Sequence, residues 1–203
     1  MIVIVDYGIG NLRSLAKVFD RLRLPASVSC SAGDIAGASG LVLPGVGHFG
    51  AAMDELRKRD LIGPLTEAVA GHGTPILGVC LGMQLLFHGS EEGDAEGLGW
   101  ISGAVRRLVP PDDGGLKVPN MGWRSLIFRQ PDPLFPDIGR AWRAYFVHGY
   151  HVTDVADDHV VATIDYGGPV VAAVRSRHLM GVQFHPEKSH AFGRALLGAF
   201  AAR

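Results

Sequence analysis

The first half of the chain alternates short apolar runs with longer segments of helical periodicity, and this alternation constrains the fold more than any other feature. The apolar runs are Ile2–Val5, Leu41–Leu43 and Ile76–Val79, and the helical segments are Leu12–Leu22, Ala51–Arg57, Leu65–Ala70 and Leu81–Phe87. Strands that alternate with helices usually pair in parallel, and the crossover helices cover both faces of the sheet. We therefore expect an α/β fold with an open, mainly parallel central sheet flanked by helices.

The second half has a different pattern, in which apolar runs are separated by Gly, Pro and Asp turns. Additional strands, antiparallel or mixed, are predicted at Val105–Leu108, Leu126–Phe128, Ala144–Val147, Val160–Ile164, Val170–Val174 and Leu179–Phe184. An amphipathic helix is predicted over Ala191–Ala202, and an exposed loop over Pro110–Gly115. Because no linker or repeat interrupts the pattern, we expect residues 1–203 to form a single domain.

The charge balance and the apolar runs limit the classes of partner. With 19 basic and 20 acidic residues the formal net charge is −1, which favours neither nucleic acid nor an anionic membrane. The longest mostly apolar run, Pro75–Phe87, is shorter than the ~20 residues that span a bilayer. The N-terminus meets Asp6 after five residues, unlike a secretory signal. We expect a cytoplasmic protein with two free cysteines, Cys30 and Cys80.

Cys80 stands where a predicted strand gives way to a predicted helix. Gly78 and Gly82 flank it and relieve crowding, as at the nucleophile elbow of hydrolases, with Cys in place of Ser. Unpaired N–H groups at a helix start favour a thiolate, and the Leu81 N–H would face a developing oxyanion. Taken alone, Cys80 could equally be a small buried apolar residue, which is the role expected for Cys30.

His185 and Glu187 form a candidate base and orienting carboxylate. Pro186 restricts His185 to the extended region, and residues two apart on an extended segment project to the same side. We therefore expect contact only if residues 183–187 are extended. Glu187 would then accept a hydrogen bond from one ring nitrogen while the other faces the thiol. In isolation, His-Pro-Glu is a surface turn; together with the cysteine elbow it predicts a catalytic set.

Two further patterns bear on the site. Leu43-Pro44-Gly45-Val46-Gly47-His48 follows a short strand, and its glycines allow close backbone approach to a ligand, so Val46 is a candidate second oxyanion donor. His148 and His151 could bind a metal, but no third ligand is evident, and a structural role is expected for His148. We predict neither a metal nor a cofactor.

Three segments together resemble the triad, or class I, glutamine amidotransferase family. They are Pro44–Gly47, Gly78–Phe87 and His185–Ser189, and the resemblance covers the whole length. Within that family Asp6–Leu12, Ser90–Gly93, Met121–Trp123 and Gln183–Ser189 look like the branch that serves histidine biosynthesis. The resemblance implies that Cys80 attacks the side-chain amide of L-glutamine, that His185 protonates the departing ammonia, and that water then cleaves a glutamyl thioester.

The resemblance also implies contacts with substrate and partner. Residues implied to hold glutamine are Gly47, Gln84 and Glu92, with the backbone of Gly149 and Tyr150 at its α-carboxylate. The partner would be a β/α-barrel cyclase, bound as a heterodimer that consumes the ammonia, and the implied interface residues are Asn11, Trp123, Tyr145 and Lys188.

Two positions depart from the family pattern. Arg124 replaces the usual Asn after Met-Gly-Trp, and Gly149 replaces a hydroxyl residue after His148. Two alternative functions remain open: the glutaminase component of anthranilate, aminodeoxychorismate or pyridoxal phosphate synthesis, and a non-catalytic regulatory subunit on the same fold. Asp6–Leu12 with Met121–Trp123 argues against the first, and retention of all three triad residues argues against the second.

Overall fold

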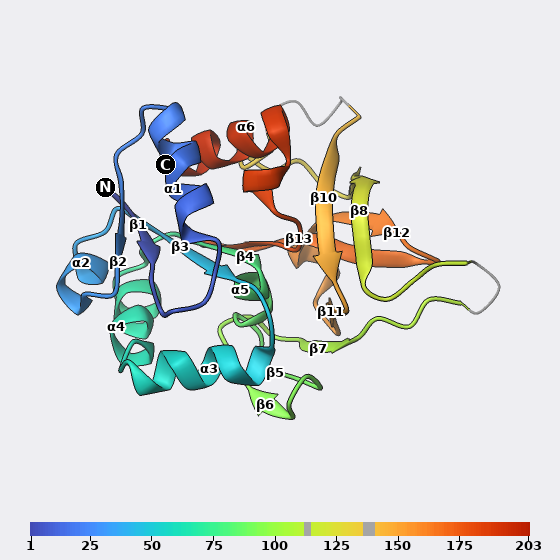
Figure 1. The fold of residues 1–203 in the computed structure, drawn as a ribbon, viewed down its shortest axis with the longest axis horizontal. Helices are drawn as coiled ribbons and strands as arrows, with labels where there is room; N and C mark the ends of the chain where they lie inside the picture. Colours follow the sequence, from blue (N-terminus) through green and yellow to red (C-terminus); the bar gives the residue numbers. More distant parts are fainter. Residues whose placement is uncertain (112–114, 136–140) are drawn as a thin grey trace.

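The computed structural model describes residues 1–111, 115–135 and 141–203, and its main element is an eight-stranded sheet (Figure 1). The strand order is β2-β1-β3-β4-β14-β13-β12-β9. The strands are β1 (Ile2–Val5), β2 (Ala26–Ser29), β3 (Gly40–Gly45), β4 (Ile76–Cys80), β9 (Ile127–Phe128), β12 (Val160–Asp165), β13 (Pro169–Ser176) and β14 (Leu179–Val182). The first five strands in this order pair in parallel and the last three join antiparallel, which confirms the predicted sheet.

Two smaller sheets flank the far end of the main sheet. A two-stranded ribbon pairs β8 (Asn120–Ser125) antiparallel with β10 (Arg143–His148). A four-stranded sheet has the order β11-β7-β5-β6, with β5 (Gly89–Ser90), β6 (Ala95–Glu96), β7 (Ala104–Arg107) and β11 (Tyr150–Thr153). Gly149 connects the two sheets, because it is the single residue between β10 of the ribbon and β11 of the four-stranded sheet. Both sheets therefore meet beside the residues that follow His148.

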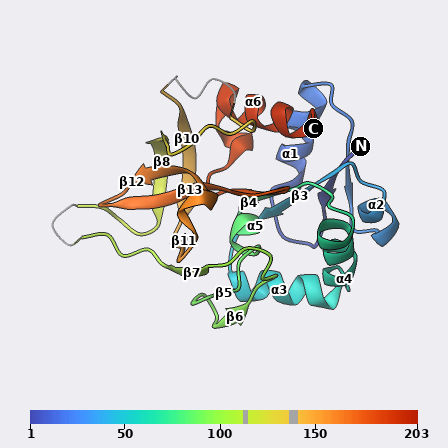
Figure 2. The ribbon, with the colours of Figure 1, turned by 180° about the vertical axis from the view of Figure 1, so that it is seen from behind.

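Helices cover both faces of the main sheet, as Figures 1 and 2 show from opposite sides. The helices are α1 (Leu12–Arg21), α2 (Ala32–Ala36), α3 (Phe49–Lys58), α4 (Ile62–Thr66), α5 (Leu81–Gln84) and α6 (His190–Ala201), with a π-helical turn over Glu67–Gly71 and 3₁₀ turns over Asp157–His159 and Pro186–Lys188. On one face Phe19 of α1 and Leu197 of α6 enter the same buried cluster. On the other, Met53 of α3 and Leu65 of α4 do so. The alternation of strands and helices thus produces the three layers it predicts.

The helix after Cys80 is shorter than predicted. It ends at Gln84 rather than Phe87, because the N–H groups of residues 86–88 do not bond four residues back: Leu86 N–H donates to Met83 O, Phe87 N–H to Gln84 O, and His88 N–H to the distant Gly103 O. The carbonyls of residues 85–87 also have distant partners. Leu98 N–H donates to Leu85 O, Trp100 N–H to Leu86 O and Gly99 N–H to Phe87 O. These bonds replace the ones that would continue the helix. Sequence periodicity cannot reveal such competition between distant segments.

Three other expectations concern the loop over 110–115, the burial of Cys30 and membrane-spanning segments. The predicted loop over 110–115 lies partly outside the described residues. Cys30 is exposed, so the expectation that it is buried was wrong; it follows the short edge strand β2. Across the described residues, no helix combines the length and apolar character needed to cross a bilayer.

Candidate active site

Three parallel strands end at one edge of the main sheet and bring three predicted site segments together. Gly45 at the end of β3 is in register with Cys80 at the end of β4, and Val79 is in register with Val182 at the end of β14. His185 follows three residues after Val182. Because carboxyl ends of parallel strands share an edge, the Pro-Gly-Val-Gly loop, the cysteine and the histidine converge there although they are far apart in sequence.

Cys80 occupies a strained turn between β4 and α5. Its φ of 57° and ψ of −111° are rare for a residue with a side chain. A Cβ on Gly82 would lie 1.8 Å from Leu43 O, and one on Gly78 would lie 2.6 Å from Gly82 O, so backbone approach excludes side chains at both positions. Cys80 itself is 6% exposed, at the wall of a cavity. The predicted elbow is therefore present.

His185 and Glu187 form a buried pair. His185 Nδ1 lies 3.0 Å from Glu187 Oε1, and the two side chains are 2% and 1% exposed. His185 is extended before Pro186, as predicted, but Pro186–Lys188 forms a 3₁₀ turn. The condition that residues 183–187 be extended throughout was therefore wrong. One extended residue followed by a tight turn also brings the imidazole to the carboxylate.

The surroundings of this pair favour its charged form. Burial lowers the pKa of His185, but the neighbouring Cys80 thiol and the hydrogen bond and charge of Glu187 outweigh burial and raise it to about 9. Burial raises the pKa of Glu187, but its hydrogen bond to His185 and the charge of that ring lower it overall. Asn11 adds a second bond, since its Nδ2 donates to Glu187 Oε1 at 3.2 Å. Near neutral pH the pair is an imidazolium and a carboxylate.

Two groups that the sequence interpretation missed contact the thiol. Gln183 Nε2 lies 3.7 Å from Cys80 Sγ, and Val147 O lies 3.9 Å from it on another side. Gln84 contacts one of these two groups, because its Nε2 donates a hydrogen bond to Gln183 Oε1 at 2.9 Å. Gln183 could have been found from its position two residues before His185, which places both side chains on one side of an extended segment.

The thiol opens into a cavity of about 170 Å³, small enough for a ligand of amino-acid size. The lining residues are Val46, Gly47, Cys80, Leu81, Gln84, Glu92, Val147, His148, Gly149, Tyr150 and His185. All the predicted oxyanion and glutamine-binding residues are among them. Of the predicted catalytic residues, only Glu187 lies behind the wall, where it contacts His185.

Individual lining groups are held in defined orientations. Glu92 Oε2 accepts a hydrogen bond from the Phe49 N–H at the start of α3, which fixes the carboxylate in the wall. Gln84 Nε2 uses both its hydrogens within the protein, on Gln183 Oε1 and on Tyr150 O. The oxygen of the Gln84 amide is thus the atom that remains for a substrate. Val46 is 41% exposed, and Gly47 beside it has a φ of +92°.

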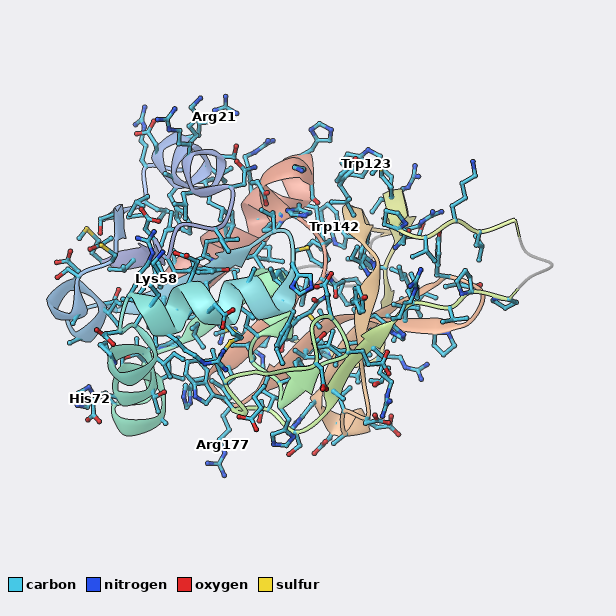
Figure 3. All side chains as sticks on the ribbon, turned by 60° about the horizontal axis from the view of Figure 1, so that its bottom comes forward. Arg21, Lys58, His72, Trp123, Trp142 and Arg177 are labelled. Carbon is cyan, nitrogen blue, oxygen red and sulfur yellow. The ribbon has the colours of Figure 1, made fainter. Side chains whose placement is uncertain are left out.

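Three of the four predicted interface residues contact one another in one cluster. Trp123 and Tyr145 face each other across the ribbon with ring centroids 6.0 Å apart, and Lys188 Nζ lies 5.7 Å from the Tyr145 ring. His190 stacks on Trp123 at 5.0 Å. Figure 3 shows Trp123 at the periphery of the molecule. Asn11 is the exception, because its amide donates to the Glu187 carboxylate instead.

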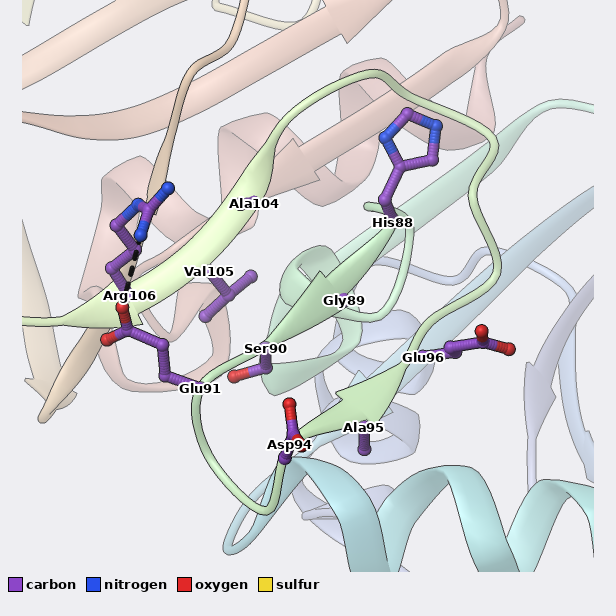
Figure 4. Close-up of a pocket in the computed structure, with 10 residues that line it drawn as sticks. All are labelled: His88, Gly89, Ser90, Glu91, Asp94, Ala95, Glu96, Ala104, Val105 and Arg106. Carbon is purple, nitrogen blue, oxygen red and sulfur yellow. Dashed lines mark hydrogen bonds and ion pairs between the residues drawn. The ribbon is translucent and has the colours of Figure 1, made fainter.

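A larger cavity of about 520 Å³ lies beside β5, β6 and β7 (Figure 4). Its charged lining residues include Glu91, Asp94 and Arg106, and Arg106 pairs with Glu91 at 3.2 Å. These two side chains are about half exposed, so the pair is a solvated surface contact of small energy. The lining contains no cysteine, and among the described residues no group of His, Cys, Asp and Glu has the geometry to hold a metal. We therefore place the chemistry in the smaller cavity.

Comparison with known families agrees with this geometry. The family model "Glutamine amidotransferase class-I" matches residues 3–201. The chain belongs to the class I glutamine amidotransferases. A solved glutamine amidotransferase superposes over all of both chains with a TM-score of 0.76 at 17% identity, a likeness that shows the amidotransferase fold alone.

Amidotransferases of one branch are much more similar in sequence. The imidazole glycerol phosphate synthase subunit HisH of Salinibacter ruber (strain DSM 13855 / M31) is 47% identical over 207 residues, covering 100% of this chain and 94% of that protein. The subunit of the same name from Geobacillus sp. (strain WCH70) is 47% identical over 205 residues, covering 100% and 96%. Similarity at this level over the whole length places this amidotransferase in the HisH branch of the family.

Proposed function

We propose that this chain is the glutaminase subunit of imidazole glycerol phosphate synthase. It would hydrolyse L-glutamine to glutamate and ammonia and pass the ammonia to a β/α-barrel cyclase, in a cytoplasmic heterodimer in which residues 1–203 act as one domain. The observation that carries the proposal is the strained Cys80 elbow beside the buried His185–Glu187 pair, at the mouth of an amino-acid-sized cavity. The HisH relatives supply the pathway.

The geometry supports a two-step acyl transfer. Cys80 Sγ attacks the carboxamide carbon, and the negative charge that develops on the oxygen meets the Leu81 N–H, one of the unpaired donors at the start of α5. The C–N bond breaks as the His185 imidazolium gives its proton to the nitrogen, so that ammonia leaves and a C–S bond remains. Neutral His185 then takes a proton from water, and the hydroxide cleaves the thioester to glutamate.

Binding of the substrate's two charged ends would use opposite parts of the wall. The α-amino group meets the Glu92 carboxylate, whose orientation is fixed by the Phe49 N–H. The α-carboxylate meets the backbone at Gly149 and Tyr150, and the Gln84 oxygen is available as an acceptor. The Val46 N–H is proposed as the second oxyanion donor, supplied by an exposed loop that a docked partner could reorient.

The test is glutamate release from glutamine by the chain mixed with a barrel cyclase and its nucleotide ligand. Cys80→Ala should lower the rate by roughly 1,000-fold or more, because no other group can form the acyl intermediate. Cys30→Ala is the matched control, since Cys30 is exposed and does not line the cavity, and it should retain full activity. Undiminished turnover by Cys80→Ala would overturn the proposal.

A second measurement addresses the alternative of a non-catalytic subunit. A thiol-directed glutamine analogue should modify Cys80 and leave Cys30 unmodified, as mass spectrometry of the digested protein would show. Absence of labelling at Cys80, together with absence of glutamate release, would favour a regulatory subunit. Glutamate release without ammonia transfer to the cyclase would instead favour a glutaminase of another pathway.

A further inference from the structure

A series of three hydrogen bonds, of which the middle one is buried, leads from Arg124 to the wall of the cavity. Arg124 Nε lies 2.9 Å from Asn120 Oδ1, Asn120 Nδ2 lies 3.0 Å from His148 Nε2, and His148 Nδ1 lies 2.8 Å from Tyr150 O. Asn120 is 0% exposed, so it cannot exchange these partners for water, and His148 is 6% exposed at the wall of the cavity. Each member of the chain therefore depends on its neighbour.

Two groups of fixed character set the direction of the bonds in this chain: the Arg124 guanidinium, which only donates, and the Tyr150 carbonyl, which only accepts. Arginine only donates hydrogen bonds, so the side-chain oxygen of Asn120 must face it. The amide nitrogen of Asn120 then faces His148 and donates, which requires Nε2 to be the unprotonated nitrogen of the ring. The ring proton is consequently on Nδ1, where it is donated to the Tyr150 carbonyl.

The last residue in this series of hydrogen bonds, Tyr150, lines the cavity. Tyr150 O also accepts a hydrogen bond from Gln84 Nε2 at 3.0 Å, and His148, Gly149 and Tyr150 all line the cavity. Two donors therefore hold this one carbonyl. Its orientation fixes the neighbouring backbone, which under the proposed function receives the α-carboxylate of glutamine.

Arg124 is itself held in place. Its Cζ lies 4.7 Å from the centroid of the Tyr166 ring, a cation–π distance, and Tyr166 is fixed by its own hydroxyl, which donates to Lys117 O at 2.6 Å. Burial lowers the pKa of His148 to about 4, with smaller contributions that include the positive charge of Arg124. A neutral ring is what the bond directions require.

We propose that Arg124 is a positioning residue for glutamine binding, which acts by fixing the amide of Asn120 and thereby holding His148 as the Nδ1–H tautomer that orients the Tyr150 carbonyl. The inference rests on the proposed function for its kinetic consequence. Without the guanidinium the Asn120 amide is free to rotate and present its oxygen to His148, where it would favour a proton on Nε2, and only the Tyr150 carbonyl then favours the proton on Nδ1.

The tautomer of His148 can be measured on the free chain. Nitrogen-15 NMR distinguishes protonated from unprotonated ring nitrogens, and a His148→Gln spectrum assigns the signals. Wild type should show Nδ1 protonated and Nε2 unprotonated. Arg124→Met should produce a mixture, whereas Arg124→Lys, which still presents only donors, should keep the wild-type state. Asn120→Asp presents only oxygens, so Nε2 should become protonated.

The kinetic arm uses the complex with the barrel cyclase. Arg124→Met should raise KM for glutamine by roughly 3- to 10-fold, a change no larger than the loss of one charge-assisted hydrogen bond would produce. Its kcat should stay within about twofold of the wild-type value. Arg107→Met is the matched control, because Arg107 is an exposed arginine on β7 whose side chain does not line the cavity. It should match wild type in both arms.

The outcomes separate this inference from the function on which it rests. A wild-type tautomer in Arg124→Met, an unprotonated Nε2 in Asn120→Asp, or a KM of Arg124→Met equal to that of Arg107→Met would each overturn the inference. A wild-type complex that releases no glutamate would overturn the proposed function instead, while the NMR arm would still decide the role of Arg124 within the chain of bonds. Thermal unfolding of each variant identifies any that fail to fold.

Discussion

The raised pKa of His185 predicts that the protein loses stability as the pH rises above neutrality. An unfolded histidine titrates near 6.5, whereas His185 in the folded protein titrates at about 9. The folded state therefore favours the protonated ring. Its contribution to stability is complete below pH 6.5, declines as the pH rises and is lost above about 9. The gap between these pKa values corresponds to about 3 kcal/mol, a large share of the 5–15 kcal/mol typical of a domain.

Urea unfolding between pH 6 and 10 tests this prediction when wild type is compared with His185→Gln. Both proteins keep Cys30 and Cys80, so titration of unfolded thiols affects both in the same direction. Across this range wild type should lose about 3 kcal/mol of unfolding free energy relative to the variant. The His185 ring signal in NMR should titrate with a midpoint near 9. Parallel stability curves, or a ring that titrates near 6.5, would refute the reasoning.

The cause of the raised pKa can be tested separately from its size. Cys80 and Glu187 both raise the pKa of His185 against burial. Cys80→Ala removes the thiol and leaves the carboxylate, so the His185 midpoint should fall below its wild-type value. An unchanged midpoint in Cys80→Ala would show that the thiol does not contribute and that Glu187 alone outweighs the effect of burial.

Two further predictions concern the elbow and the predicted partner surface. Gly82→Ala would place a methyl group 1.8 Å from Leu43 O, so urea unfolding should show that the free energy of unfolding falls by about 3 kcal/mol or more. Gly63 has open space around it, so Gly63→Ala should change the free energy of unfolding by less than about 1 kcal/mol. Equal effects of the two substitutions would contradict the predicted steric clash at Gly82. Trp123→Ala should weaken binding of the barrel cyclase by roughly 10-fold or more in calorimetry, as expected for an aromatic anchor. Trp100→Ala serves as the control. An unaltered affinity of Trp123→Ala would show that Trp123 is not part of the interface.

The features that the sequence predicted are those whose signals are local. The strand that ends at Cys80 and the extended His185 before Pro186 each follow from a few neighbouring residues. Parallel pairing then brings them together without further information, because strand ends share an edge. The proximity of Cys80, His185 and Glu187 was therefore within reach of sequence reasoning, whereas their catalytic roles stay a prediction.

The features that were missed depend on distant segments. Strand β8 lacks apolar alternation and exists through its pairing with β10, where Asn120 is opposite His148. The early end of α5 involves distant partners, because His88 N–H donates to Gly103 O and the carbonyls of residues 85–87 accept from residues 98–101. His148 was expected to be structural, and only the register of β8 with β10 reveals that its ring joins Asn120 to the cavity. Each of these depends on which strands become neighbours.

The β8–β10 ribbon joins the predicted partner surface to the cavity through its own backbone. Alternate residues of a strand face opposite sides, so Trp123 and Tyr145 lie on the outer face while Arg124 and His148 lie on the inner one. The backbone of the ribbon also contacts the proposed base, since the Tyr145 carbonyl accepts a hydrogen bond from the His185 N–H at 2.9 Å. We infer that a partner that shifts this ribbon moves the base and the carboxylate-binding backbone together. The NMR signals of both rings, His148 and His185, should change when the cyclase binds, and signals that stay fixed would show that coupling takes another route.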